Sequence, residues 1–236
     1  MITILIMNKR PTFFLCLSML FIAVSCDRFK SEKASDPSNK NVVFDESSPN
    51  LLSGITPLFE NGDVNAVIEI PSGTLEKWEL NKSTGKVEWE LADNKPRIIN
   101  YLGYPGNYGM IPRTLLSKEN GGDGDPLDVL VLGHPVERGS ILKCKIIGVL
   151  YLMDRGEQDD KLIAVSANSP LYEVNSISEL NKNYNGITAI IQLWFTNYKG
   201  PGKMESRGFG ERNNATEILI TAIHDYEARE TKHNNQ

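Results

Sequence analysis

Three aspartates within six residues stand directly before an apolar run, and this junction constrains the fold more than any other part of the chain. The acids are Asp123, Asp125 and Asp128, and the apolar run covers residues 129–132. A short apolar run bounded by Gly and Pro predicts a buried strand, so the acids lie on a turn at the end of a rigid element. Pro126 fixes one backbone angle of that turn, and Gly124 allows a conformation that other residues resist.

These three carboxylates repel one another unless a partner neutralises them. Carboxylate oxygens are good ligands for hard ions such as Mg²⁺, Mn²⁺ or Ca²⁺. The junction therefore predicts a metal site at the end of a strand. A solvated acidic turn is the competing interpretation.

Short apolar stretches separated by Gly, Pro and Asp predict a mainly β domain. Strands are expected at residues 64–70, 76–80, 129–132, 141–152 and 161–165. Several short strands with turn residues between them indicate a small barrel or sandwich. The interpretation we favour is a mostly antiparallel barrel with helices packed outside it.

Two helices are expected after the strands. The first covers Ile187, Ile190, Ile191, Trp194 and Tyr198, which recur at the spacing of one helical face. The second opens at Asn214, with Glu217 completing a capping box, and buries Leu219, Ala222, Ile223 and Tyr226. Residues 200–212, rich in Gly and charge, are expected to form an exposed loop between them.

The first 25 residues have the features of a secretory signal peptide. Lys9 and Arg10 precede an apolar stretch, residues 13–24, that is too short to span a bilayer comfortably. Cys26 follows small residues, which resembles the lipobox of bacterial lipoproteins, in which the cysteine carries lipid. We therefore expect an exported, membrane-anchored lipoprotein on the periplasmic or cell-surface side, held by its lipid alone. Ordinary cleavage nearby, giving a free secreted protein, is the alternative.

The remaining chain divides into three parts. Residues 26–60 are mostly polar and predict a flexible tether after the lipidated cysteine, with a short apolar patch at residues 51–59 that packs on the domain. Residues 61–230 are expected to form one domain, and residues 231–236 a disordered tail. Cys144 alternates with apolar neighbours and is expected to be a buried structural thiol. Loss of residues 1–25 removes two positive side chains and changes the net charge from −5 to −7, which argues against a nucleic-acid partner.

A second acidic loop follows the long apolar stretch that ends at Leu152. It contains Asp154, Asp159 and Asp160, followed by Lys161. Two acidic loops from neighbouring strands would converge on one multi-metal site. Other polar side chains fit a phosphate ligand, among them Lys77 on a strand and the Tyr198–Lys199 pair at the end of a helix.

Four sequence blocks together resemble the first family of soluble inorganic pyrophosphatases. They are Val67-Ile-Glu-Ile-Pro71, Tyr104-Pro-Gly-Asn-Tyr-Gly109, Asp123-Gly-Asp-Pro-Leu-Asp-Val129 and the Asp154, Asp159, Lys161 spacing. The resemblance extends from about residue 61 to residue 230. It implies an α+β, mainly β fold, a five-stranded OB-type closed barrel with flanking helices. It also implies a homo-oligomer that hydrolyses pyrophosphate with several Mg²⁺ ions, for which Mn²⁺ could substitute.

The resemblance assigns roles to individual residues. The metal ligands would be Asp123, Asp128, Asp154 and Asp159. The carboxylate that accepts a proton from the metal-activated water would be Asp125. The residues that hold phosphate oxygens would be Lys77, Arg97, Tyr108, Tyr198 and Lys199. Further polar positions around the cavity would be Glu69, Glu79, Tyr104 and Lys161.

Arg97 is the assignment that fits the family pattern least well, and Lys95 is an alternative for the same basic role. The implied reaction is a direct attack of water on phosphorus without a covalent intermediate. Two other functions compete with it: a non-catalytic lipoprotein of the same fold that binds metal or polyphosphate, and a barrel that binds oligonucleotides. The second would need basic and aromatic strands rather than acidic loops.

Overall fold

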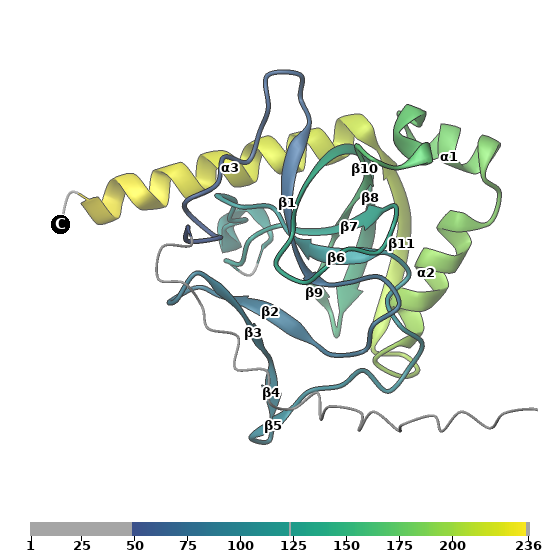
Figure 1. The fold of residues 1–236 in the computed structure, drawn as a ribbon, viewed down its shortest axis with the longest axis horizontal. Coiled ribbons are helices and arrows are strands. Elements are labelled where there is room, and N and C mark those ends of the chain that lie inside the picture. Colours follow the sequence, from purple (N-terminus) through teal and green to yellow (C-terminus); the bar gives the residue numbers. More distant parts are fainter. Residues whose placement is uncertain (1–48, 123, 235–236) are drawn as a thin grey trace, which may run out of the picture. The chain divides into compact units, whose positions relative to one another are not determined.

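The computed structural model describes residues 49–122 and 124–234 (Figure 1). The signal segment, Cys26, the tether up to residue 48 and Asp123 lie outside the described residues, so the predictions made for them are not tested. Within the described part of the chain, no helix has both the length and the apolar character that a bilayer span requires.

Five strands close into a barrel. They are β1 (Val64–Ile70), β6 (Asn107–Met110), β7 (Asp128–Leu132), β10 (Lys161–Ser166) and β8 (Ile141–Asp154). Each pairs with the next in that order, and β8 pairs with β1 to complete the ring. Only the β7–β10 pair among these five is parallel. The predicted five-stranded, mostly antiparallel barrel with flanking helices is therefore confirmed.

The length of β8 allows it to serve three partners in succession. Its start pairs with β1, its middle with β10, and its end with β11 (Met204–Glu211). A Cβ atom on Gly148 would lie 2.3 Å from Ile177 Cγ1 and 2.5 Å from Gly210 O, so only glycine permits this close approach. The expectation of an exposed loop over residues 200–212 is wrong, because most of that segment is strand β11.

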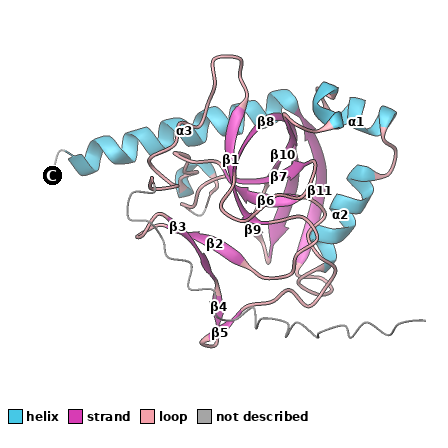
Figure 2. Cartoon of the chain, in the orientation of Figure 1, coloured by secondary structure: helices cyan, strands magenta, loops and turns pink. Residues whose placement is uncertain are grey.

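Both faces of the barrel strands are buried, which explains their continuous apolar runs. On β7, Val129 and Val131 pack in the cluster that includes α3 (Arg212–Asn234), whereas Leu130 and Leu132 pack in the cluster of α1 (Ile177–Asn183) and α2 (Ile187–Asn197). Figure 2 shows the three helices outside the strands. Cys144 is a fully buried free thiol, as predicted, and burial raises its pKa.

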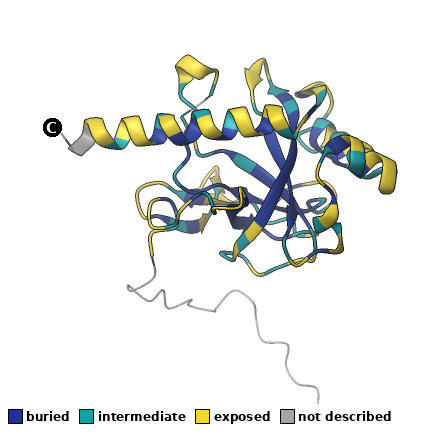
Figure 3. Cartoon of the chain, turned by 90° about the horizontal axis from the view of Figure 1, so that it is seen from above, coloured by how far each residue is buried: buried dark blue, intermediate teal, exposed yellow. Residues whose placement is uncertain are grey.

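The helices differ from expectation at their ends. α3 begins at Arg212, and the Asn214 side chain accepts a hydrogen bond from Glu211 N, so Asn214 lies inside the first turn rather than before it. The four residues of α3 that were expected to face the protein core are all buried. Figure 3 shows that the opposite side of α3 is exposed. α3 continues to Asn234 without a helix breaker and thus includes most of the expected disordered tail. On α2, the predicted face residue Ile190 is exposed, whereas Phe195, which the prediction left out, is buried.

A pair of small hairpins lies beside the barrel, and we call residues 77–97 the hairpin arm. It contains β2 (Trp78–Asn81), β3 (Lys86–Trp89), β4 (Leu91–Ala92) and β5 (Lys95–Pro96). The two residues between β4 and β5, Asp93 and Asn94, both have positive φ, as a tight type I′ turn requires. Leu80 and Val87 attach the arm to Val67 of β1. Shorter elements are β9 (Glu157–Gln158) and the 3-10 turns at Lys118–Asn120 and Pro170–Glu173.

Candidate active site

A cavity of about 400 Å³ lies between the hairpin arm, the start of β7, the β8–β10 loop and the end of α2. The predicted site residues that line it are Glu69, Lys77, Glu79, Arg97, Tyr104, Tyr108, Asp125, Asp128, Asp159, Lys161, Tyr198 and Lys199. Asp154 is connected to the cavity through its contact with Lys199. Lys95 is exposed on β5 and is not among the lining residues, so Arg97 is the better placed of the two alternatives.

The loop before β7 presents the acidic turn to the cavity. Thr114 is buried, and its hydroxyl accepts a hydrogen bond from Leu127 N at 2.9 Å and donates one to Ile111 O at 2.6 Å. Gly124 has a φ of +88°, the left-handed conformation that favours glycine at this position. Asp125 is half-exposed at the mouth of the cavity, where it forms an ion pair with Lys82.

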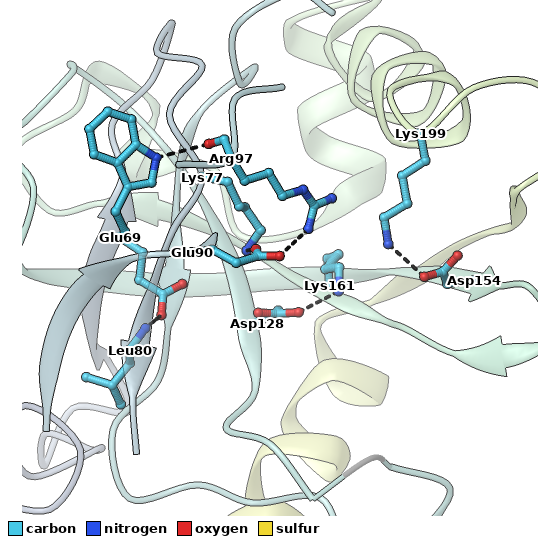
Figure 4. Close-up of polar contacts among 10 residues, drawn as sticks. Glu69, Lys77, Leu80, Glu90, Arg97, Asp128, Asp154, Lys161 and Lys199 are labelled. Carbon is cyan, nitrogen blue, oxygen red and sulfur yellow. Dashed lines mark hydrogen bonds and ion pairs between the residues drawn. The ribbon is translucent and has the colours of Figure 1, made fainter. Parts of the chain in front are cut away.

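Lys161 joins the two acidic loops. Its side chain is 2% exposed, and its Nζ lies 2.5 Å from Asp128 Oδ2 (Figure 4). The same Nζ lies 2.6 Å from Asp159 Oδ1. Burial alone would lower the pKa of Lys161, but the two carboxylates outweigh it and raise the pKa. Burial also raises the pKa of Asp159, against the opposing effect of Lys161. One buried ammonium therefore holds two predicted metal ligands in place.

Asp154 pairs with Lys199 at 2.7 Å through Oδ2, while its Oδ1 is buried without a hydrogen-bond partner among the described residues. A buried carboxylate oxygen without a donor is unusual and is available to a cation. No group of three His, Cys, Asp or Glu side chains in the described residues is already gathered around one point. The unpartnered Asp154 oxygen and the carboxylate donor set nevertheless suit a hard divalent ion.

Glu69 of β1 is the most strongly buried acid in the cavity wall. Its side chain is 5% exposed, and Oε1 accepts a hydrogen bond from Leu80 N at 2.7 Å. Burial raises the pKa of Glu69 to about 8, with Lys77 opposing the shift and Asp128 adding to it. The carboxyl is therefore mostly protonated near neutral pH and connects the barrel to the hairpin arm without adding a full charge.

Glu69→Gln should change how stability depends on pH. Between a pKa near 4.5 in the unfolded chain and about 8 in the fold, the native state holds an extra proton, so the free energy of unfolding falls as pH rises through that window. Gln keeps the acceptor for Leu80 N and cannot ionise. We expect urea denaturation in EDTA to show the variant gaining stability over wild type from pH 5 to pH 8, by a few kcal/mol at most. Parallel profiles would contradict the assignment.

The hairpin arm contributes two cations on the other side of the cavity. Lys77 Nζ lies 3.7 Å from Glu90 Oε2, and Arg97 donates a hydrogen bond from an Nη atom to Glu90 Oε1 at 2.5 Å. Lys77 also lies over the ring of Tyr108, 5.9 Å from its centroid. Both cations line the cavity, whereas Glu90 lies behind them.

Three tyrosines form an aromatic wall together with Trp194 of α2. The ring of Tyr104 lies 5.2 Å from that of Tyr108 and 4.3 Å from that of Trp194, which stacks on Tyr198 at 4.5 Å. Burial raises the pKa of all three tyrosines. Their hydroxyls therefore stay protonated and can donate hydrogen bonds to an anion.

Sequence reasoning missed three polar residues at or behind the cavity. Lys82 and Gln158 line it, and Glu90 supports its cations. Asp160, predicted as part of the second acidic loop, lines the cavity as well. Asp160 accepts hydrogen bonds from Leu152 N at 2.9 Å and from Gln158 at 2.7 Å, which orders the second acidic loop. Lys82 stands in a polar turn and Glu90 between two apolar residues, and both look like ordinary surface positions. No signal in the sequence singles them out.

Comparison with known proteins gives one family. The family model described as inorganic pyrophosphatase matches residues 66–227. The inorganic pyrophosphatase of Campylobacter jejuni is 34% identical over 171 residues, which cover 69% of this chain and 91% of that protein. A soluble inorganic pyrophosphatase of maize is 41% identical over 57% of this chain. The chain spans 58% of the length of the maize protein and of a Drosophila relative.

Solved structures agree with the sequence matches. The inorganic pyrophosphatase of Thermus thermophilus superposes with a TM-score of 0.64 at 29% identity, covering 75% of this chain and 99% of that one. The type I inorganic pyrophosphatase of P falciparum superposes with a TM-score of 0.72 at 25% identity, covering 80% of this chain and 67% of that one.

Proposed function

The chain belongs to the inorganic pyrophosphatase family, and from this premise we propose that it hydrolyses inorganic pyrophosphate to two phosphates by direct attack of water. One observation carries the proposal: carboxylates from two acidic loops and cations from the hairpin arm and α2 line a single cavity. Such a cavity can hold metal ions on one side and the oxygens of a small polyanion on the other.

Membership of this family fits a metal-dependent reaction. We propose that Asp123, Asp128, Asp154 and Asp159 hold several Mg²⁺ ions, with Mn²⁺ as a possible substitute. When bound, these ions would neutralise phosphate oxygens and lower the pKa of water. The unpartnered Oδ1 of Asp154 supports this assignment, because a bound cation would satisfy it.

The remaining residues of the cavity supply binding and proton transfer. Asp125, at the mouth of the cavity, would accept the proton of the attacking water as general base. Lys77, Arg97 and Lys199 would bind phosphate oxygens and stabilise the charge that develops on them. The hydroxyls of Tyr108 and Tyr198, kept protonated by burial, would donate further hydrogen bonds.

Release of phosphate from pyrophosphate tests this function directly. With Mg²⁺, purified protein should release phosphate far above buffer alone, and EDTA should abolish the release. A protein that binds metal or polyphosphate without turnover, the alternative function, would release none. Measuring ATP and tripolyphosphate alongside pyrophosphate would show which phosphoanhydride is preferred.

We propose in addition that the protein is an exported lipoprotein, anchored outside the cytoplasm through Cys26. The support is the lipobox-like sequence around Cys26 after an apolar segment with a positive start.

We also propose that the protein forms a homo-oligomer. Large apolar side chains exposed near α2, among them Leu102 and Leu193, support it because they would be covered by a second subunit.

Cys26→Ser should release the protein from membranes. One acyl-modified cysteine supplies the whole anchor in this interpretation, so its loss removes the apolar area that holds the protein in lipid. Fractionation of cells that express the full chain should find the wild type with membranes and the variant in the soluble fraction. Cys144→Ser is the matched control and should remain with membranes. Retention of the Cys26 variant would contradict lipidation.

A further inference from the structure

Glu90 connects the two cations of the hairpin arm, although it does not itself line the cavity. Its carboxylate uses one oxygen for Arg97 and the other for Lys77 (Figure 4). The side chain of Glu90 is 21% exposed, that of Arg97 32% and that of Lys77 16%, so the three charged groups are partly shielded from solvent. Neither cation has another carboxylate partner among the ion pairs of the described residues.

The backbone brings the same three residues together. Arg97 N donates to Glu90 O at 2.8 Å, Glu90 N donates to Lys77 O at 2.9 Å, and Lys77 N donates to Arg97 O at 3.0 Å. These three hydrogen bonds form a closed cycle. The Trp89 indole N–H donates to Arg97 O as well, at 3.0 Å.

The β4–β5 hairpin explains how this cycle forms. Leu91 pairs with Pro96 and Ala92 with Lys95, so Glu90 and Arg97 form the next pair at the open end of the hairpin. Residues opposite each other in an antiparallel pair project on the same face, which places the Glu90 carboxylate beside the Arg97 guanidinium. The hairpin thus returns the chain to the cavity at Arg97.

We propose that Glu90 is a positioning residue, which sets the spacing and direction of Lys77 and Arg97 so that both meet the oxygens of one phosphate group. The inference rests on the proposed function for the identity of the ligand. A lysine and an arginine on flexible stems would otherwise repel each other and spread apart, and ordering them on binding would weaken affinity. A shared carboxylate behind them removes that repulsion and leaves their outer N–H groups directed into the cavity.

The test compares Glu90→Ala, Glu90→Gln and the control Glu88→Gln. Glu88 lies two residues earlier, on β3, and contacts Asn81 and Thr84, away from both cations. We expect Glu90→Ala to raise KM for pyrophosphate about tenfold with a smaller change in kcat, and Glu90→Gln, which keeps an acceptor for Arg97, about threefold. Glu88→Gln should leave KM unchanged. Titration calorimetry with imidodiphosphate should give matching increases in Kd.

Three results would overturn the inference. Tighter binding in both Glu90 variants would mean that the carboxylate only weakens the attraction of the cavity for anions. Unchanged KM and Kd together with a lower melting temperature would mean a purely structural role. An undiminished effect of Glu90→Ala in an Arg97→Ala background would mean that Glu90 does not act through Arg97. Absence of wild-type turnover would instead contradict the proposed function, and binding of imidodiphosphate would still test Glu90.

Discussion

Asp125→Asn is expected to lower kcat for pyrophosphate by about 10²-fold or more, the usual effect of losing a general base. The amide has the shape of the carboxylate but cannot accept a proton from water at neutral pH. Asp125 is half-exposed at the mouth of the cavity, where solvent can remove the proton after each turnover. Because the proposed metal ligands are other aspartates, the Mg²⁺ concentration for half-maximal activity should change much less than kcat. Steady-state phosphate release over a range of Mg²⁺ concentrations measures both.

Lys82→Met is the matched control for this variant. Asp125→Asn also removes the ion pair with Lys82, and that loss alone could disturb the loop. An exposed pair of this kind contributes at most about 1 kcal/mol, so Lys82→Met should keep most of the activity. Equal losses in the two variants would attribute the effect to the ion pair, and a wild-type rate for Asp125→Asn would exclude Asp125 as the base.

The barrel strands could be predicted from the sequence where they consist of continuous apolar residues. β7 and β10 are buried on both faces, so their continuous apolar runs are clear. β11 reads Met-Glu-Ser-Arg-Gly-Phe-Gly-Glu and lacks such a run, because it pairs with β8 along one edge and is half-exposed. β6, Asn-Tyr-Gly-Met, has the composition of a turn and is a strand only because β1 and β7 lie on either side of it. Both β11 and β6 are therefore strands because of their tertiary pairing and not because of their own sequence.

Some residues of the candidate site could likewise be predicted from the sequence, and others could not. Acidic residues at strand ends, such as Asp128 and Asp159, could be assigned to the site because their density has no simple structural purpose. Glu90 could not, because a glutamate that directly follows a short strand is an ordinary surface pattern. Its place depends on the tight turn of the β4–β5 hairpin, which brings residues seven apart in sequence into direct contact. The roles assigned to individual residues remain predictions until the variants are measured.

Lys161→Met is expected to lower the free energy of unfolding by about 3 kcal/mol in EDTA at neutral pH, the low end of the range for removing one partner from a buried ion pair. Lys161 is 2% exposed and contacts both Asp128 and Asp159, so its loss leaves two carboxylates facing each other without a cation. The carboxylates are 32% and 24% exposed, which reduces the penalty because water can still reach them. Urea denaturation measures the difference, with Lys82→Met as the exposed control.

Addition of Mg²⁺ tests whether the two carboxylates that Lys161 neutralises also bind metal. If Asp128 and Asp159 are metal ligands, a divalent ion can supply the positive charge that the variant lacks, and Mg²⁺ should stabilise Lys161→Met more than it stabilises the wild type. Lowering the pH towards 5 should also reduce the difference, because Asp159, whose pKa burial raises, would take up a proton once Lys161 no longer opposes it. Equal stabilisation of both proteins by Mg²⁺ would mean that the metal binds elsewhere, and it would remove Asp128 and Asp159 from the proposed ligand set.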